Sequence, residues 1–88
     1  MPAKILYFRS NSCAPCRATS PVVAEYASLP ESLDVEIVNV ESNFETAMKY
    51  GVRSLPQLIL IDEESNEIER VPNPSQITVN KLLEQFDH

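Results

Sequence analysis

Two cysteines separated by two residues, between a predicted strand and a predicted helix, constrain this chain more than any other feature. Cys13 and Cys16 are the only two cysteines in the sequence. Residues 5–8 form an unbroken apolar run with the length of a buried strand. Residues 14–29 contain no glycine and predict a helix. The start of a helix presents free N–H groups and a positive dipole end, which favour an anion such as a cysteine thiolate.

This placement predicts different roles for the two thiols. Cys13 precedes the helix, so we expect it to be the exposed thiol and the nucleophile. Cys16 lies one turn into the helix, where we expect it to be more buried and less ionised. Cys13 would attack a substrate disulfide, and Cys16 would then attack Cys13 and release the reduced substrate. Pro15 keeps the helix start rigid and removes no N–H that the helix needs.

Two other uses of the cysteines remain alternatives. A zinc site needs three or four protein ligands, and His88 is the only histidine. We therefore expect no metal site. A permanent disulfide is also possible in principle, but so short a loop gains little chain entropy from closure. Redox use is the leading interpretation.

Composition narrows the class of protein. Eighty-eight residues predict one domain, spanning residues 1–88. The net charge of -6 argues against nucleic acid or an anionic membrane as partner. No apolar run has transmembrane length, and the N-terminus lacks the features of a signal peptide. We therefore expect a cytoplasmic protein, where reducing conditions favour catalytic over structural cysteines.

Apolar periodicity and turn residues predict four strands and three helices. In chain order they are a strand from 4 to 8 or 9, a helix over 14–29, a strand over 33–40, a helix ending at Tyr50, strands over 58–61 and 67–71, and a helix capped by Ser75. Ser42 and Glu45 have the spacing of a capping box for the second helix, and Gly51 can take a left-handed cap at its end. The order implies a parallel pair, an antiparallel hairpin and helices on both sheet faces.

Two motifs, one at the cysteines and one before the third predicted strand, resemble the thioredoxin family in sequence and in order along the chain. Residues 12–17, Ser-Cys-Ala-Pro-Cys-Arg, are similar to that family's Trp-Cys-Gly-Pro-Cys-Lys. Residues 50–56, Tyr-Gly-Val-Arg-Ser-Leu-Pro, match the segment that ends in the family's cis-proline. The resemblance covers residues 4–86. It implies an α/β thioredoxin fold in its minimal βαβα-ββα form, a four-stranded mixed sheet flanked by three helices, without the strand and helix that precede this point in full-length members.

The resemblance also implies a substrate-binding surface around the cysteines. Its residues would be Ala14 and Pro15 between the cysteines, and Leu55 and Pro56 in the second motif. Leu55 would pair through its backbone with an extended substrate, and Leu55–Pro56 would be a cis peptide. The residues alone favour an ordinary trans proline that opens a strand, because only about one X-Pro bond in twenty is cis.

Several residues are candidates for tuning the thiols. Three arginines, Arg9, Arg17 and Arg53, would lie near Cys13 in this fold and favour its thiolate. A set of solvated arginines without that role is an equally good interpretation. Tyr7 stands where the family has a buried aspartate, so the usual proton-handling carboxylate is missing. We therefore expect deprotonation of Cys16 to rely on water or on the leaving thiol.

The leading functional hypothesis is a monomeric protein-disulfide reductase with a Cys13–Cys16 redox disulfide and no bound cofactor. Its reducing equivalents would come from an NADPH-linked thioredoxin reductase, and disulfide-forming enzymes such as ribonucleotide reductase would be substrates. A glutaredoxin-like reductase that uses glutathione is the nearest alternative, although Cys-Pro-Tyr-Cys, Thr-Val-Pro and paired glycines are absent. A thioredoxin-fold docking subunit without catalytic use is the alternative from another class.

Overall fold

The structure is a computed structural model that describes residues 3–30 and 33–72. Its elements in chain order are β1 (Lys4–Arg9), α1 (Ala14–Ala27), β2 (Asp34–Asn39), α2 (Phe44–Lys49), β3 (Gln57–Ile61) and β4 (Glu67–Pro72). The predicted order of these six elements is confirmed, and their ends differ from the predicted ones by one or two residues. The predicted last helix, from Ser75 to Phe86, lies outside the described residues. No described helix is long and apolar enough to cross a membrane.

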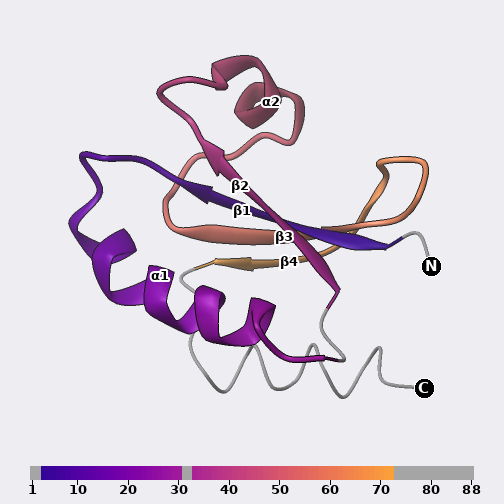
Figure 1. The fold of residues 1–88 in the computed structure, drawn as a ribbon. Coiled ribbons are helices and arrows are strands. Elements are labelled where there is room, and N and C mark those ends of the chain that lie inside the picture. The colour runs from indigo at the N-terminus through magenta and orange to yellow at the C-terminus, as the bar shows by residue number, and fades with distance from the viewer. Residues whose placement is uncertain (1–2, 31–32, 73–88) are drawn as a thin grey trace.

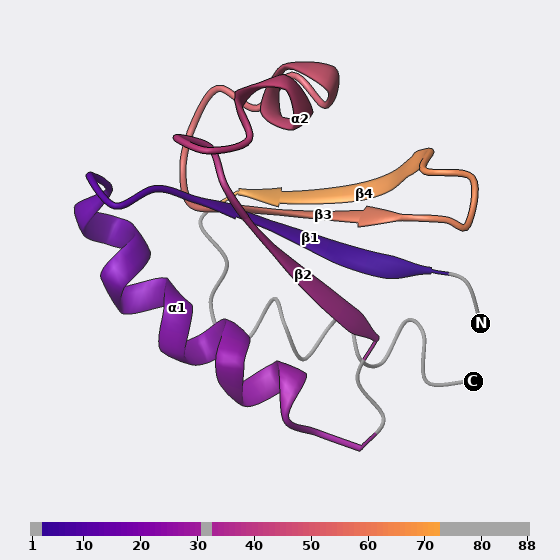
Figure 2. The ribbon, with the colours of Figure 1, turned by 45° about the horizontal axis from the view of Figure 1, so that its top comes forward.

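The four strands form one mixed sheet in the order β2-β1-β3-β4. β1 pairs with β2 in parallel, from Lys4 opposite Asp34 to Arg9 opposite Asn39. β3 runs antiparallel to both β1 and β4. The two helices of the described residues, α1 and α2, lie on opposite faces of the sheet, as Figures 1 and 2 show. The expected parallel pair joined to an antiparallel hairpin is therefore confirmed.

Alternation along the strands divides the core into two layers, one on each sheet face. The layer on the α1 side consists of Ile5, Tyr7, Val23, Tyr26, Leu58 and Leu60. The layer on the α2 side consists of Leu6, Phe8, Val38, Ala47, Ile59 and Ile61. Every residue of β3 is buried, since helices cover both faces of this central strand. The cysteine-bearing helix is thus held on the sheet by Val23 and Tyr26.

The start of α2 differs from the prediction. The N-cap residue is Asn43, and its side chain makes no capping hydrogen bond. The predicted capping box of Ser42 and Glu45 is therefore wrong. The physical reason lies in the preceding turn: the N–H groups of Ser42 and Asn43 both donate to the carbonyl of Asn39, at 3.0 and 2.9 Å. That turn occupies Ser42, and the helix therefore begins one residue later than the box requires.

The predicted left-handed end of α2 is confirmed. Gly51 has φ +62°, a value that glycine adopts without steric cost. Its N–H donates to the carbonyl of Met48, and the N–H of Val52 donates to the carbonyl of Ala47, both at 3.0 Å. This is the Schellman arrangement, in which two otherwise unpaired carbonyls at the helix end are satisfied. It turns the chain toward β3.

The β3–β4 hairpin contains an irregularity. Ile61 pairs with Glu67, whereas the neighbouring Leu60 pairs with Glu69, so β4 carries one extra residue between them. Such a bulge shifts the alternation of side chains along the strand by one position. Glu67 and Arg70, three residues apart, are therefore on the same face of the sheet.

Candidate redox site

The cysteines lie beyond the carboxyl ends of the parallel strands β1 and β2, the edge where sheets of this kind place their sites. The loop between β1 and Cys13 is fastened to the end of β2. The Ser12 hydroxyl donates to the Glu41 carboxylate at 3.0 Å, and the Asn39 amide donates to Asn11 at 3.4 Å. Ser10 is buried, and its hydroxyl accepts from the N–H of Ser12 at 3.2 Å. These contacts hold the approach to Cys13 in place.

Cys13 and Cys16 form a disulfide, with their Cα atoms 5.3 Å apart. Cys13 is the N-cap residue of α1, and its Sγ accepts a hydrogen bond from the N–H of Cys16 at 3.2 Å. Cys13 is half-buried, whereas Cys16 is only 1% exposed. Ala14 and Pro15 between them are exposed. The helix N-terminus therefore presents an N–H group to the sulfur of the half-buried Cys13, whereas Cys16 is buried.

Behind the disulfide, the phenol of Tyr7 is buried and faces the start of α1. Its hydroxyl lies 2.9 Å from the hydroxyl of Ser20 and 3.4 Å from the carbonyl oxygen of Cys16. Tyr7 and Ser20 also line a cavity of about 390 Å³ between α1 and the β1–β2 pair, with the exposed Ile37 at its rim. Ser20 was not among the predicted site residues. Its position one turn after Cys16 was the available signal.

The second motif directly precedes β3, whose first residue, Gln57, pairs with Phe8 near the end of β1. The Leu55–Pro56 peptide bond is cis. Pro56 is buried and Leu55 is half-buried. Within the described part of the chain, neither the N–H nor the carbonyl of Leu55 makes a hydrogen bond. A second cavity of about 150 Å³ adjoins Leu55 and is lined also by Phe44, Val52 and Arg53.

The three arginines are placed differently. The guanidinium of Arg9 donates to the carbonyl of Ser10 at 3.4 Å and to Asn11 at 3.5 Å, in the loop that leads to Cys13. Arg17 is exposed on α1, and Arg53 is exposed beside Leu55. Among the described residues, none of the three forms a hydrogen bond or ion pair with a cysteine. No cluster of three or more metal-binding side chains occurs in residues 3–30 and 33–72.

Comparison with known proteins identifies the family. The Thioredoxin family model matches residues 2–85, which is nearly the whole chain. The chain belongs to the thioredoxin family. Its Cys13–Cys16 disulfide lies in the motif on which the family resemblance rests.

Individual relatives agree with the family. The thioredoxin of Methanocaldococcus jannaschii is 38% identical over 58 residues, 65% of this chain and 68% of the relative. That of Rhodospirillum rubrum is 35% identical over 57 residues, 64% of this chain and 55% of the relative. The chain thus spans about half to two thirds of the length of these curated relatives.

Solved structures show the thioredoxin fold directly. A mutant thioredoxin from Halobacterium salinarum superposes with a TM-score of 0.83 at 26% identity, covering 99% of this chain and 76% of that one. A malarial protein superposes with the same score at 22% identity and covers 97% of both chains. The second likeness shows the fold alone.

Proposed function

We propose that this thioredoxin-family protein reduces disulfides in other proteins through Cys13-Ala-Pro-Cys16. The observation that carries the proposal is the contrast between the two sulfurs. Cys13 is accessible and accepts an N–H from the helix start, whereas Cys16 is buried. A hydrogen bond to sulfur stabilises the thiolate, which is the reacting form of cysteine. Cys13 thus has the access and the stabilisation that the attacking thiol needs.

The cycle transfers two electrons from the dithiol to the substrate. The Cys13 thiolate attacks one substrate sulfur, forms a mixed disulfide and displaces the other substrate sulfur as a thiolate, which takes up a proton. Cys16 then loses its proton and attacks Cys13 Sγ, which breaks the mixed disulfide and releases the second substrate thiolate. The product is the Cys13–Cys16 disulfide, the form present in the structure. An external dithiol or reductase must reduce it before the next cycle.

The surroundings of the disulfide support the roles of the other site residues. The backbone groups of Leu55, which have no partner among the described residues, are suited to pairing with an extended substrate segment. Pro56 and the exposed Ala14 and Pro15 are the other proposed substrate-binding residues. Tyr7 stands where the family has a buried aspartate, and its hydroxyl donates to the carbonyl of Cys16. Water entering the adjoining cavity reaches the Tyr7–Ser20 hydroxyl pair and is a route for the proton of Cys16.

Charge and partners follow from the same proposal. Arg9, Arg17 and Arg53 add positive potential around an otherwise acidic molecule and favour the Cys13 thiolate. A cytoplasmic NADPH-linked thioredoxin reductase is the proposed electron donor, and cytoplasmic enzymes that form disulfides during turnover, ribonucleotide reductase among them, are the proposed substrates. Glutathione is the alternative donor, as in a glutaredoxin-like protein.

Reduction of insulin by dithiothreitol tests this function. Wild-type protein should accelerate the precipitation of the insulin B chain, and a Cys13→Ser/Cys16→Ser double variant should not, because it lacks the dithiol. Folded wild-type protein that gives no acceleration would exclude general reductase activity and leave the docking-subunit alternative. Replacing dithiothreitol first with NADPH and thioredoxin reductase, and then with glutathione, identifies the electron donor.

A further inference from the structure

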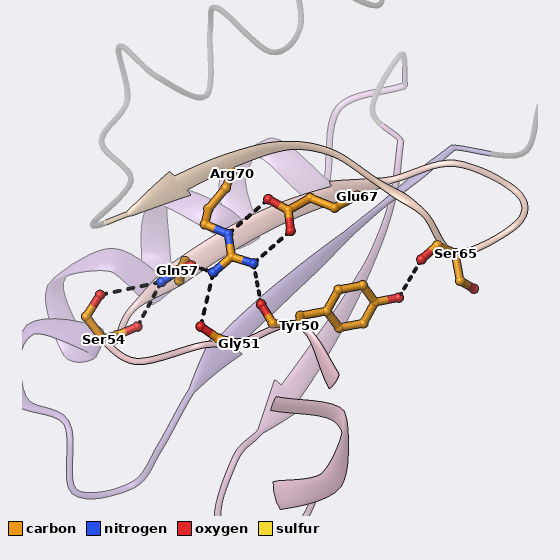
Figure 3. Close-up of polar contacts among 7 residues, drawn as sticks. All are labelled: Tyr50, Gly51, Ser54, Gln57, Ser65, Glu67 and Arg70. Atoms are coloured by element: carbon orange, nitrogen blue, oxygen red, sulfur yellow. Dashed lines mark hydrogen bonds and ion pairs between the residues drawn. The ribbon is translucent and has the colours of Figure 1, made fainter. Parts of the chain in front are cut away.

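Arg70 of β4 uses its whole guanidinium group in contacts with other residues (Figure 3). Nε donates to Glu67 at 3.0 Å, and Nη1 donates to the side-chain oxygen of Gln57 at 2.9 Å and to the carbonyl of Gly51 at 3.3 Å. Nη2 donates to Glu67 at 2.7 Å and to the carbonyl of Tyr50. A guanidinium carries five N–H donors, so these five bonds match its full capacity. Such a fork fixes geometry in a way that a single charge does not.

Strand pairing and the bulge in β4 place Gln57, Glu67 and Arg70 on one face of the sheet. Gln57 and Arg70 share the α2 face of the sheet because Arg70 pairs with Ile59, two residues after Gln57. The bulge in β4 brings Glu67 onto the same face. Arg70 donates hydrogen bonds to Glu67 and thereby holds the pKa of that carboxyl below its ordinary value, so the carboxylate is charged and paired at neutral pH.

The contacts continue from Arg70 to the substrate-binding motif. Gln57 is only 3% exposed, and its amide donates to the carbonyl of Ser54 at 3.1 Å and to the Ser54 hydroxyl at 3.4 Å. Ser54 directly precedes Leu55. Arg70 therefore anchors the segment from Tyr50 to Pro56 twice, at its beginning through the Tyr50 and Gly51 carbonyls and near its end through Gln57. Figure 3 shows both anchors converging on one guanidinium.

We propose that Arg70 and Gln57 are positioning residues for polypeptide substrates, because they fix the Leu55 backbone that pairs with the substrate. This inference rests on the proposed reductase function and on pairing at Leu55. Neither side chain forms a hydrogen bond with a cysteine, so we expect thiol chemistry itself not to depend on them. A small disulfide that needs no pairing with Leu55 should therefore react normally when they are replaced.

Single-turnover reactions of the pre-reduced protein with two substrates distinguish an effect on substrate positioning from an effect on thiol chemistry. One substrate is insulin and the other is 5,5′-dithiobis(2-nitrobenzoate), a small disulfide without a peptide backbone. Arg70→Met should slow the reaction with insulin about fivefold, because the segment that pairs with the substrate loses its hydrogen bonds to Arg70. The rate with the small disulfide should change less than about twofold. Gln57→Met, which leaves the bonds of Arg70 to Glu67 and Tyr50, should act in the same direction.

Lys4→Met is the matched control. It also removes one positive charge and one ion pair, the 2.7 Å contact between Lys4 and Glu36 at the far end of β1. It should leave both rates unchanged. Equal loss of both rates in the Arg70 and Gln57 variants, or normal insulin rates in both, would overturn the inference. Failure of the wild type to react with insulin would instead refute the reductase function.

Discussion

A Cys16→Ser variant should accumulate as a covalent complex with its disulfide substrate. In this variant Cys13 keeps its place at the start of α1 and attacks the substrate, but no second thiol is available to break the mixed disulfide. Multiple turnover of insulin should fall by about a hundredfold or more, because release of each substrate then depends on external thiol. Non-reducing gels and mass spectrometry of the purified complex measure the linkage.

The same substitution at the other cysteine, Cys13→Ser, is the control for formation of the covalent complex. Cys13→Ser leaves only Cys16, which is 1% exposed and out of reach of a protein disulfide. It should give neither turnover nor complex. Complexes of similar yield from the two single variants would contradict the assignment of Cys13 as the attacking thiol.

Phe8→Ala should be the most destabilising single substitution considered for this fold. The Phe8 ring is fully buried on the α2 side of the sheet, where it packs with Ile59 and Ala47. The centroids of the Phe8 and Tyr50 rings are 6.1 Å apart. Removing a buried phenylalanine costs about 3–5 kcal/mol, whereas a whole domain is stable by only about 5–15 kcal/mol. A chain of this size is at the low end of that range. Chemical denaturation followed by circular dichroism should show most of the stability lost.

Phe44→Ala provides the same change of side chain in a different environment. Phe44 is 64% exposed at the start of α2, so its removal should alter the free energy of unfolding by less than about 0.5 kcal/mol. Comparable losses from Phe8→Ala and Phe44→Ala would contradict the assignment of Phe8 to the core.

Much of the fold and the cysteine site was predictable because the signals are local. The apolar run before Cys13, the helix after it and the hairpin between β3 and β4 each depend on neighbouring residues, and the structure confirms them. The left-handed cap at Gly51 was predictable because it is the only glycine in the chain. The thioredoxin family followed from two short motifs, and the match over residues 2–85 confirms it.

The features that were missed depend on contacts between distant residues. The start of α2 is determined by a turn around the Asn39 carbonyl, which outweighed the local capping signal of Ser42. The pairing of Tyr7 with Ser20 requires the packing of α1 on the sheet. The contacts of Arg70 require the bulge in β4, and no residue pattern indicated that bulge.

Limited alkylation of the fully reduced wild-type protein tests the role of Cys13 most directly. The protein is treated with less than one equivalent of iodoacetamide at neutral pH, and the modified thiol is identified by fragmentation of the peptide spanning residues 10–17, which contains both cysteines. Cys13 is only half-buried and accepts the helix N–H, whereas Cys16 is buried, so the label should be found almost entirely on Cys13. Preferential labelling of Cys16, or equal labelling of both cysteines, would contradict the proposed order of attack.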